Sequence, residues 1–140
     1  MIVKQITLTV AENTRLADGI YRLRLAGDTS AITAPGQFVN LKLSGFFLRR
    51  PISVCDWSDG ELTLIYKVLG HGTEAMTGMA PGTELDVLTG LGNGYDVSRS
   101  GEHPLLVGGG VGIPPLYGLS KQLTAQGKRV TAVLGFNRES

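Results

Sequence analysis

Apolar and polar residues alternate along short runs in the first two-thirds of the chain, and this alternation constrains the fold more than any other feature. A period of two places every second side chain on one face of a strand, so each run predicts a half-buried β-strand. The runs cover residues 6–10, 21–25, 39–43, 62–68 and 85–87. Glycine, proline, aspartate and serine lie between them, as they do in turns. We therefore expect a Greek-key barrel of short antiparallel strands, because closure removes exposed edges.

The pattern changes near residue 100. Leu105, Leu106 and Val107 are apolar at consecutive positions, which is typical of a strand buried on both faces. A glycine cluster follows, then leucines at helical spacing over residues 115–126, then a second apolar run at 130–134. This order predicts a βαβ unit and hence a parallel sheet. The predicted fold class is mainly β, with a barrel over residues 1–99 and the start of an α/β domain over 100–140.

Two strands and one helix cannot cover both faces of a parallel sheet. We therefore expect the sequence to be the N-terminal part of a longer protein. We also expect the segment after residue 100 to be mobile, swapped between copies, or buried in an oligomer contact.

Composition argues against several classes of function. The sequence has 13 Lys and Arg residues and 12 Asp and Glu residues, for a net charge of +1. It therefore lacks the basic excess of a nucleic-acid-binding protein. The start lacks the apolar run of a signal peptide, and no stretch approaches the roughly 20 apolar residues that cross a membrane. The single cysteine, Cys55, is expected to pack within a strand; alone it can hold neither zinc nor an iron–sulfur cluster. It also fits a cytoplasmic protein.

The first motif that could carry chemistry is Arg49-Arg50-Pro51-Ile52-Ser53. Pro51 lacks an N–H group, so the segment is expected at a strand edge or bend. Arg50 offers a planar fork for a phosphate, and Ser53 offers a hydroxyl for close contact. From the spacing alone, a solvated arginine pair beside an edge strand is the more frequent arrangement.

The second motif is Gly70-His71-Gly72-Thr73, at the start of a predicted short helix. Glycines before a helix let backbone N–H groups face an anion, and the helix dipole favours it. When the motif is taken alone, an ordinary turn and helix cap is the better explanation. Together, the guanidinium of Arg50 and this helix start supply the two sides that a pyrophosphate needs.

The third motif is a glycine cluster between the strand at 105–107 and the helix that follows. A strand, a glycine turn and a helix are the setting of dinucleotide binding. Counting from Gly110, the third glycine of the G-x-G-x-x-G fingerprint is replaced by Pro115, so the usual pyrophosphate clamp is not predicted. We expect the glycines to allow close approach of a nicotinamide or of a neighbouring flavin instead.

Other polar residues are given structural roles. His71 and His103 are far apart and are expected on the surface. Trp57 is expected at the barrel rim, and Asp86 and Asp96 at strand ends or turns. We predict no catalytic side chain, and no set of metal ligands, in this chain.

Taken in order, these motifs resemble the ferredoxin–NADP reductase superfamily, in which a flavin-binding barrel precedes a nucleotide-binding domain. Within it, the sequence is similar to the electron-transfer subunits of class B dihydroorotate dehydrogenases. The resemblance runs the whole length and is carried by residues 35–38, 48–53, 65–68, 72–73, 90–94 and 106–117.

The resemblance implies that FAD lies on the barrel over residues 1–99, and that residues 100–140 begin an NAD-binding domain. The residues implied to line the flavin and its phosphates are Arg50, Pro51, Ile52 and Ser53. Those implied to contact the flavin or its ribityl chain are Ile65, Tyr66 and Lys67. Those implied to hold the pyrophosphate are Gly72 and Thr73, and Gly109 and Gly110 complete the implied cofactor contacts.

The implied role is to relay electrons from an FMN-containing, dihydroorotate-oxidising catalytic subunit, through a [2Fe–2S] cluster, to FAD and then NAD. That chemistry belongs to pyrimidine biosynthesis in the cytoplasm and implies a heterotetramer. The family carries cysteines for the cluster near its C-terminus, whereas here Cys55 stands alone, so we expect this chain to bind no cluster and to be inactive by itself in full electron transfer. Two alternatives stay open: a reductase subunit of another enzyme, such as a hydrogenase, and a flavin-free barrel scaffold.

Overall fold

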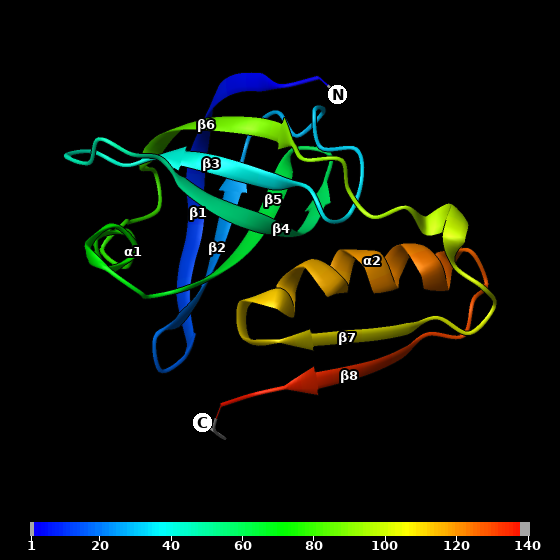
Figure 1. Ribbon diagram of the computed structural model, residues 1–140. Helices are drawn as coiled ribbons and strands as arrows, with labels where there is room; N and C mark the ends of the chain where they lie inside the picture. Colours follow the sequence, from blue (N-terminus) through cyan, green and yellow to red (C-terminus); the bar gives the residue numbers. More distant parts are fainter. Residues whose placement is uncertain (1, 138–140) are drawn as a thin grey trace.

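The computed structural model describes residues 2–137, so residues 1 and 138–140 of the two predicted domain ranges lie outside the description (Figure 1). Six antiparallel strands form a closed barrel: β1 (Lys4–Ala17), β2 (Ile20–Ala26), β3 (Phe38–Lys42), β4 (Arg50–Ser58), β5 (Glu61–Lys67) and β6 (Glu84–Leu91). Around the barrel they follow the order β1-β2-β5-β4-β3-β6. Strands β3, β4 and β5 lie side by side in the order of the sequence, and β5 also pairs with the earlier strand β2, which is the Greek-key arrangement. The predicted barrel is therefore confirmed.

The barrel interior is built from the alternation that predicted the strands. On β5, Leu62, Leu64 and Tyr66 point inward and are almost fully buried. The short helix α1 (His71–Met76) closes one end of the barrel, and its Met76 side chain is fully buried in the same core. Burying aliphatic side chains in this way is the main favourable contribution to folding.

Strand β1 is longer than its apolar run because polar residues extend it. Glu12 accepts hydrogen bonds from Arg22 at 2.6 Å and from Arg24 at 2.9 Å, both on the neighbouring β2. These bonds, with a further one from Thr14, lower the pKa of Glu12 to about 2. Cross-strand ion pairs on the outer face thus stabilise this half of the strand, where the alternation of apolar and polar residues is absent.

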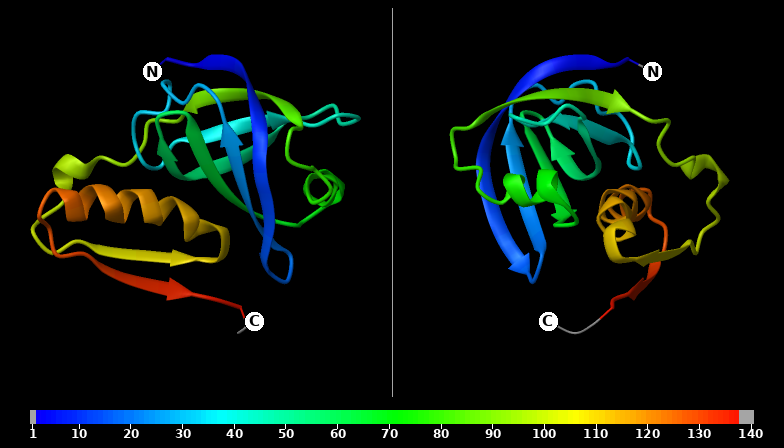
Figure 2. Two further views of the ribbon diagram at one scale, coloured as in Figure 1. Left: turned by 180° about the vertical axis from the view of Figure 1, so that it is seen from behind. Right: turned by 60° about the vertical axis from the view of Figure 1, so that its left-hand side comes forward.

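The chain after the barrel forms the predicted βαβ unit. It consists of β7 (Leu105–Gly109), α2 (Pro114–Ala125) and β8 (Thr131–Gly135), and β7 pairs with β8 in parallel. Two short 3₁₀ turns, Val97–Arg99 and Gly110–Gly112, flank β7. Helix α2 lies between the barrel and the two strands, and the views from behind and from the side agree (Figures 1 and 2).

The expectation that β7 is buried on both faces is wrong for the described residues. Leu106 faces α2 and is buried with Leu119 and Leu123. Leu105 and Val107 face the other way and are 61% and 69% exposed. Helix α2 covers one face of the sheet, and no described element covers the other.

Residue 100, the proposed domain boundary, lies in the connection between β6 and β7. Within residues 2–137, no helix is both long and apolar enough to cross a lipid bilayer.

Candidate functional site

Strands β4 and β5 pair along only part of their length. Their ladder runs from Ser58 and Glu61 to Val54 and Leu64. Beyond that point β4 stays paired with β3, and β5 stays paired with β2. The predicted segments 50–53 and 65–67 therefore lie along two adjacent strand edges that no longer bond to each other. We call this place the β4–β5 split.

A β-bulge lies directly beside the split. Val54 pairs with Leu64 and Asp56 pairs with Thr63, so Cys55 is the extra residue on β4. A bulge bends its strand and increases the local twist. Cys55 is buried, as predicted for a packed strand residue, and burial raises the pKa of its thiol to about 11.

The predicted residues at the split divide between its two faces. The side chains of Ile52 and Tyr66 point into the barrel core. The Tyr66 hydroxyl donates to Oδ1 of Asn13 at 3.0 Å, and burial raises its pKa to about 12. Ile52 and Tyr66 can thus contact a ligand mainly through their backbone atoms. The side chains of Ser53 and Ile65 point to the outer face instead.

Arg50 and Gly72, from the first and second motifs, are in direct contact. A Cβ atom on Gly72 would lie only 2.6 Å from Cζ of Arg50, so a larger residue there would require the guanidinium to shift from this position. The guanidinium also lies over the ring of Phe46, with Cζ 5.2 Å from the ring centroid, and donates to the carbonyl of Leu48. The structure thus brings the guanidinium of Arg50 next to Gly72 at the start of α1, although the two residues are some twenty positions apart in the sequence.

Thr73 shapes the turn that leads into α1. Its Oγ accepts from the backbone N–H groups of Leu69 at 2.8 Å and Gly70 at 3.2 Å, and it donates to the Gly70 carbonyl. The far end of α1 is held by Asn13, whose amide donates to the carbonyl of Met76 at 2.8 Å. Sequence reasoning missed Asn13, because nothing local marks a polar residue inside a strand as a helix anchor.

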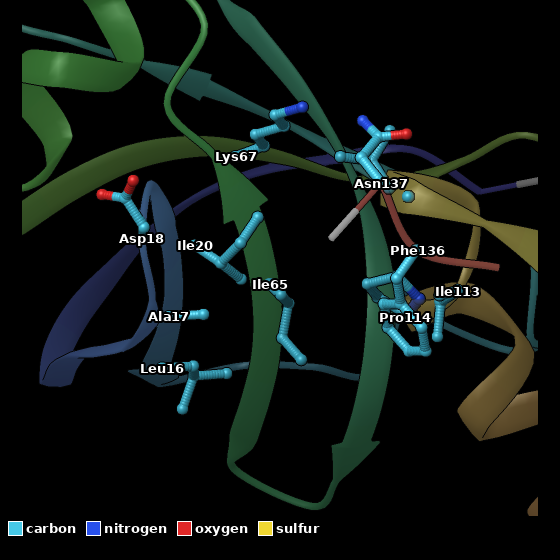
Figure 3. Close-up of a pocket in the computed structure, with 12 residues that line it drawn as sticks. Leu16, Ala17, Asp18, Ile20, Ile65, Lys67, Ile113, Pro114, Phe136 and Asn137 are labelled. Atoms are coloured by element: carbon cyan, nitrogen blue, oxygen red, sulfur yellow. The ribbon is translucent and has the colours of Figure 1, made fainter. Parts of the chain in front are cut away.

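A cleft of about 350 Å³ opens between the barrel and the βαβ unit (Figure 3). It is lined by Leu16, Ala17, Asp18, Ile20, Ile65, Lys67, Gly110, Val111, Ile113, Pro114, Phe136 and Asn137. Three of these, Ile65, Lys67 and Gly110, are predicted site residues, and the fold brings them together. The β1–β2 hairpin and Phe136 were not predicted, since their place in the site depends on tertiary packing. A mostly apolar cleft of this size suits a flat organic ring.

The glycines between β7 and α2 are constrained to different degrees. A Cβ on Gly108 would meet Cδ1 of Leu116 at 2.6 Å, so this glycine is needed for packing within the chain. A Cβ on Gly109 would meet only the Gly135 carbonyl, at 3.9 Å, and one on Gly110 would meet nothing within 4 Å. Gly110 has a φ of +55°, a left-handed value that favours glycine. The backbone at 109–110 is therefore open to close approach.

The remaining candidates have structural roles. His71 and His103 are exposed, and Trp57 packs against the barrel core. Asp86 accepts from Gln5 and Arg49, and these bonds lower its pKa.

Asp96 accepts from the N–H of Ser98 and caps a 3₁₀ turn. Between residues 2 and 137, no three side chains of the metal-binding types gather into a ligand set.

No family model matches the sequence. Curated relatives do match it along almost its whole length. The electron transfer subunit of dihydroorotate dehydrogenase B (NAD(+)) from Geobacillus sp. (strain WCH70) is 46% identical over 96% of this chain. The subunit of the same name from Enterococcus faecalis is 45% identical over 95% of this chain. These matches cover 56% and 53% of the two relatives, so the chain spans about half their length.

Two solved structures with similar folds are an oxidoreductase and a reductase. An NADH-dependent reduced ferredoxin–NADP oxidoreductase superposes with a TM-score of 0.86 at 31% identity, covering 94% of this chain and 49% of that one. An Amycolatopsis cytochrome P450 reductase also gives 0.86, at 26% identity, covering 97% of this chain and 44% of that one. The chain is therefore similar to the dihydroorotate dehydrogenase B electron transfer subunits over about half their length, and it has the fold of ferredoxin reductase-like FAD/NAD domains.

Proposed function

We propose that this chain binds FAD across the β4–β5 split, with the pyrophosphate beside Arg50 and Gly72 and the isoalloxazine ring towards the cleft. The observation that carries the proposal is the contact between Arg50 and Gly72. It joins the only two elements that the sequence marks as anion-binding into one place on the barrel surface.

The residues at this contact fit a pyrophosphate chemically. A guanidinium binds phosphate oxygens through parallel charge-assisted hydrogen bonds. The first N–H groups of a helix have no partner within the helix and point outwards from its start. The guanidinium of Arg50 lies over the ring of Phe46 and beside Gly72, which supports its role as the phosphate-binding group.

The residues farther along the split fit the rest of the cofactor. Ser53 and Ile65 lie on the outer face of the two edges, and Ile65 and Lys67 also line the cleft. The backbone of Pro51, Ile52 and Tyr66 would complete the contact. When bound, FAD supplies reversible one- and two-electron chemistry. The protein residues bind and orient the ring and exclude water from one side of it.

Gly109 and Gly110 are proposed to let a nicotinamide approach the flavin. Their backbone has no neighbour in the way, and Gly110 lies at the cleft. This places the NAD-facing side of the site at the start of α2, next to the barrel.

For the whole protein, we propose the role that the names of its relatives indicate: transfer of electrons between a dihydroorotate-oxidising catalytic subunit and NAD. The FMN of that subunit, a heterotetrameric assembly, a [2Fe–2S] cluster bound outside this chain and a cytoplasmic location stay predictions. Identity of 45–46% to these subunits, against 31% to the ferredoxin–NADP oxidoreductase, favours them over another reductase.

Absorbance spectroscopy tests the proposal directly. The purified chain is incubated with FAD and passed through a desalting column. The fractions that contain the protein are expected to show the visible absorbance bands of oxidised flavin. Retention with FAD but much less with riboflavin is the expected result, because riboflavin lacks the phosphates that Arg50 would hold. A colourless protein after FAD loading would refute flavin binding by this chain and favour the scaffold alternative.

A further inference from the structure

Helix α2 approaches the barrel at one glycine. A Cβ atom on Gly118 would lie 3.0 Å from the carbonyl oxygen of Cys55, 3.6 Å from Cβ of Pro35 and 3.7 Å from Cζ3 of Trp57. Contacts to backbone oxygens cannot be relieved by turning a side chain. Glycine in a helix interior is otherwise less favourable than alanine. Its presence here allows the helix to rest directly on the backbone of β4.

One turn farther along, the same helix face is held by an ion pair. The ammonium group of Lys121 lies 3.0 Å from both carboxylate oxygens of Asp56. The hydrogen bond that Lys121 donates to Asp56 raises the pKa of Lys121. Lys121 also lies 5.6 Å from the ring centroid of Tyr117, which limits the positions that its side chain can adopt.

Both contacts fall on the β-bulge. Gly118 touches the carbonyl of Cys55, the extra residue of the bulge, and Lys121 pairs with Asp56, the next residue. The bulge is also where the β4–β5 ladder stops. The place where the barrel receives α2 is thus adjacent to the place where its two strands separate.

We infer that Gly118 and the Asp56–Lys121 ion pair are positioning residues, which fix the start of α2 and the open glycines at 109–110 against the β4–β5 split. Helix α2 begins at Pro114, and a short 3₁₀ turn, Gly110–Gly112, connects it to these glycines, so a shift of the helix is expected to move them too. The inference rests on the proposed function, in which the split holds FAD. It adds to that function the residues that set the separation between the flavin and the nicotinamide side.

The effect on the helix can be measured without any ligand, by amide hydrogen exchange over residues 105–119. In Gly118→Ala, the helix must move away by a few tenths of an ångström, and exchange there is expected to become faster on the order of tenfold. In Asp56→Asn, loss of a half-exposed ion pair is expected to make it roughly two- to fivefold faster. The double variant Asp56→Lys with Lys121→Asp is expected to return towards the wild-type rate.

Two variants serve as matched controls. Gly101→Ala adds the same methyl group at a glycine with nothing within 4 Å. Asp28→Asn removes a carboxylate from an ion pair with Lys4, at 3.1 Å, that stays within the barrel. Neither control is expected to change exchange over residues 105–119.

The effect on the cofactor is read from the visible circular dichroism of FAD-loaded protein. Gly118→Ala and Asp56→Asn are expected to bind FAD within about twofold of wild type, because Arg50 and Gly72 are untouched, and yet to change the flavin dichroism. Superimposable spectra with FAD bound would overturn the positioning role. Unchanged exchange in both variants would overturn it as well. If the wild type binds no FAD, the proposed function fails, and exchange alone decides whether these residues position the glycines.

Discussion

The barrel and the βαβ unit both contain strands with apolar side chains, but they bury these side chains to different extents. Leu64 of β5 is fully buried, whereas Leu105 of β7 is 61% exposed. The barrel closes on itself, so every inward side chain meets another layer. Among residues 2–137, α2 is the only layer that covers the unit, and α2 in turn rests on the barrel. An apolar run thus predicts a strand, but its side chains are buried in a core only where another layer packs against them.

The two regions also divide the proposed site between them. The barrel supplies the anion-binding contact of Arg50 and Gly72, and the unit supplies the open glycines. We therefore expect the stability of the chain and its hold on the phosphates to come from the barrel. The geometry of the NAD-facing side depends on how α2 is seated.

The largest expected effect compares the same substitution in both regions. Leu64→Ala removes a fully buried side chain and leaves a cavity, so the free energy of unfolding is expected to fall by about 2–5 kcal/mol. Leu105→Ala removes an exposed side chain and is expected to change it by less than about 0.5 kcal/mol. Urea unfolding followed by circular dichroism measures both. Equal losses would show that β7 is covered in solution.

The second prediction concerns the phosphate contact. Arg50→Ala is expected to weaken FAD binding by roughly 1.5–3 kcal/mol, because it removes a charge-assisted hydrogen-bond donor. Fluorescence titration of FAD gives the affinity, and Arg99→Ala, at a largely exposed arginine in the connection to β7, is the matched control. Unchanged FAD affinity in Arg50→Ala would show that Arg50 does not bind the phosphates.

A third prediction concerns the glycines of the βαβ unit. Gly108→Ala is expected to destabilise the unit by about 1–3 kcal/mol, because its methyl group would overlap Leu116. Hydrogen exchange should report this loss over residues 105–125 and leave the barrel strands unchanged. Gly109→Ala, with open space around it, is expected to leave exchange unchanged in the free protein. Barrel strands that respond equally to Gly108→Ala would mean that the two regions unfold as one.

The smallest effect expected is on acid stability, because the groups involved are partly exposed to solvent. Hydrogen bonds from Arg22 hold the pKa of Glu12 at about 2, below its ordinary value of 4.5. A carboxylate with a lowered pKa stabilises the fold above pH 4.5, and this contribution is lost as pH falls towards 2. Glu12→Gln should therefore flatten the decline of the urea midpoint between pH 5 and pH 2.5. A decline as steep as in wild type would assign acid sensitivity to other carboxylates.

The strands were predictable wherever one face meets the core and the other meets solvent. The run at residues 62–68 matches β5 closely for that reason. Strand β4 carries no clean alternation, because Cys55 forms a bulge that interrupts the period. The polar half of β1 was missed since its pairing depends on ion pairs with β2, and a hydropathy pattern cannot register these.

The sequence predicted part of the candidate site, and which of its residues bind a ligand stays a prediction. Arg50 and Gly72 could be paired beforehand because a pyrophosphate requires both kinds of donor. Phe46 and Ile20 could not, because an apolar residue in a loop or strand has no local mark of a ligand contact. Their roles arise only when the barrel closes and α2 docks.

The closed barrel has a consequence for the order of events in the life of the protein. Arg50 and Ser53 are paired with β3, and Lys67 is paired with β2, although β4 and β5 no longer pair with each other there. We therefore expect the barrel to fold before it binds the proposed FAD, because pairing with β3 and β2 already holds both strand edges. Synthesis of the polypeptide and delivery of flavin can then be separated in time, with occupancy governed by the concentration of free FAD.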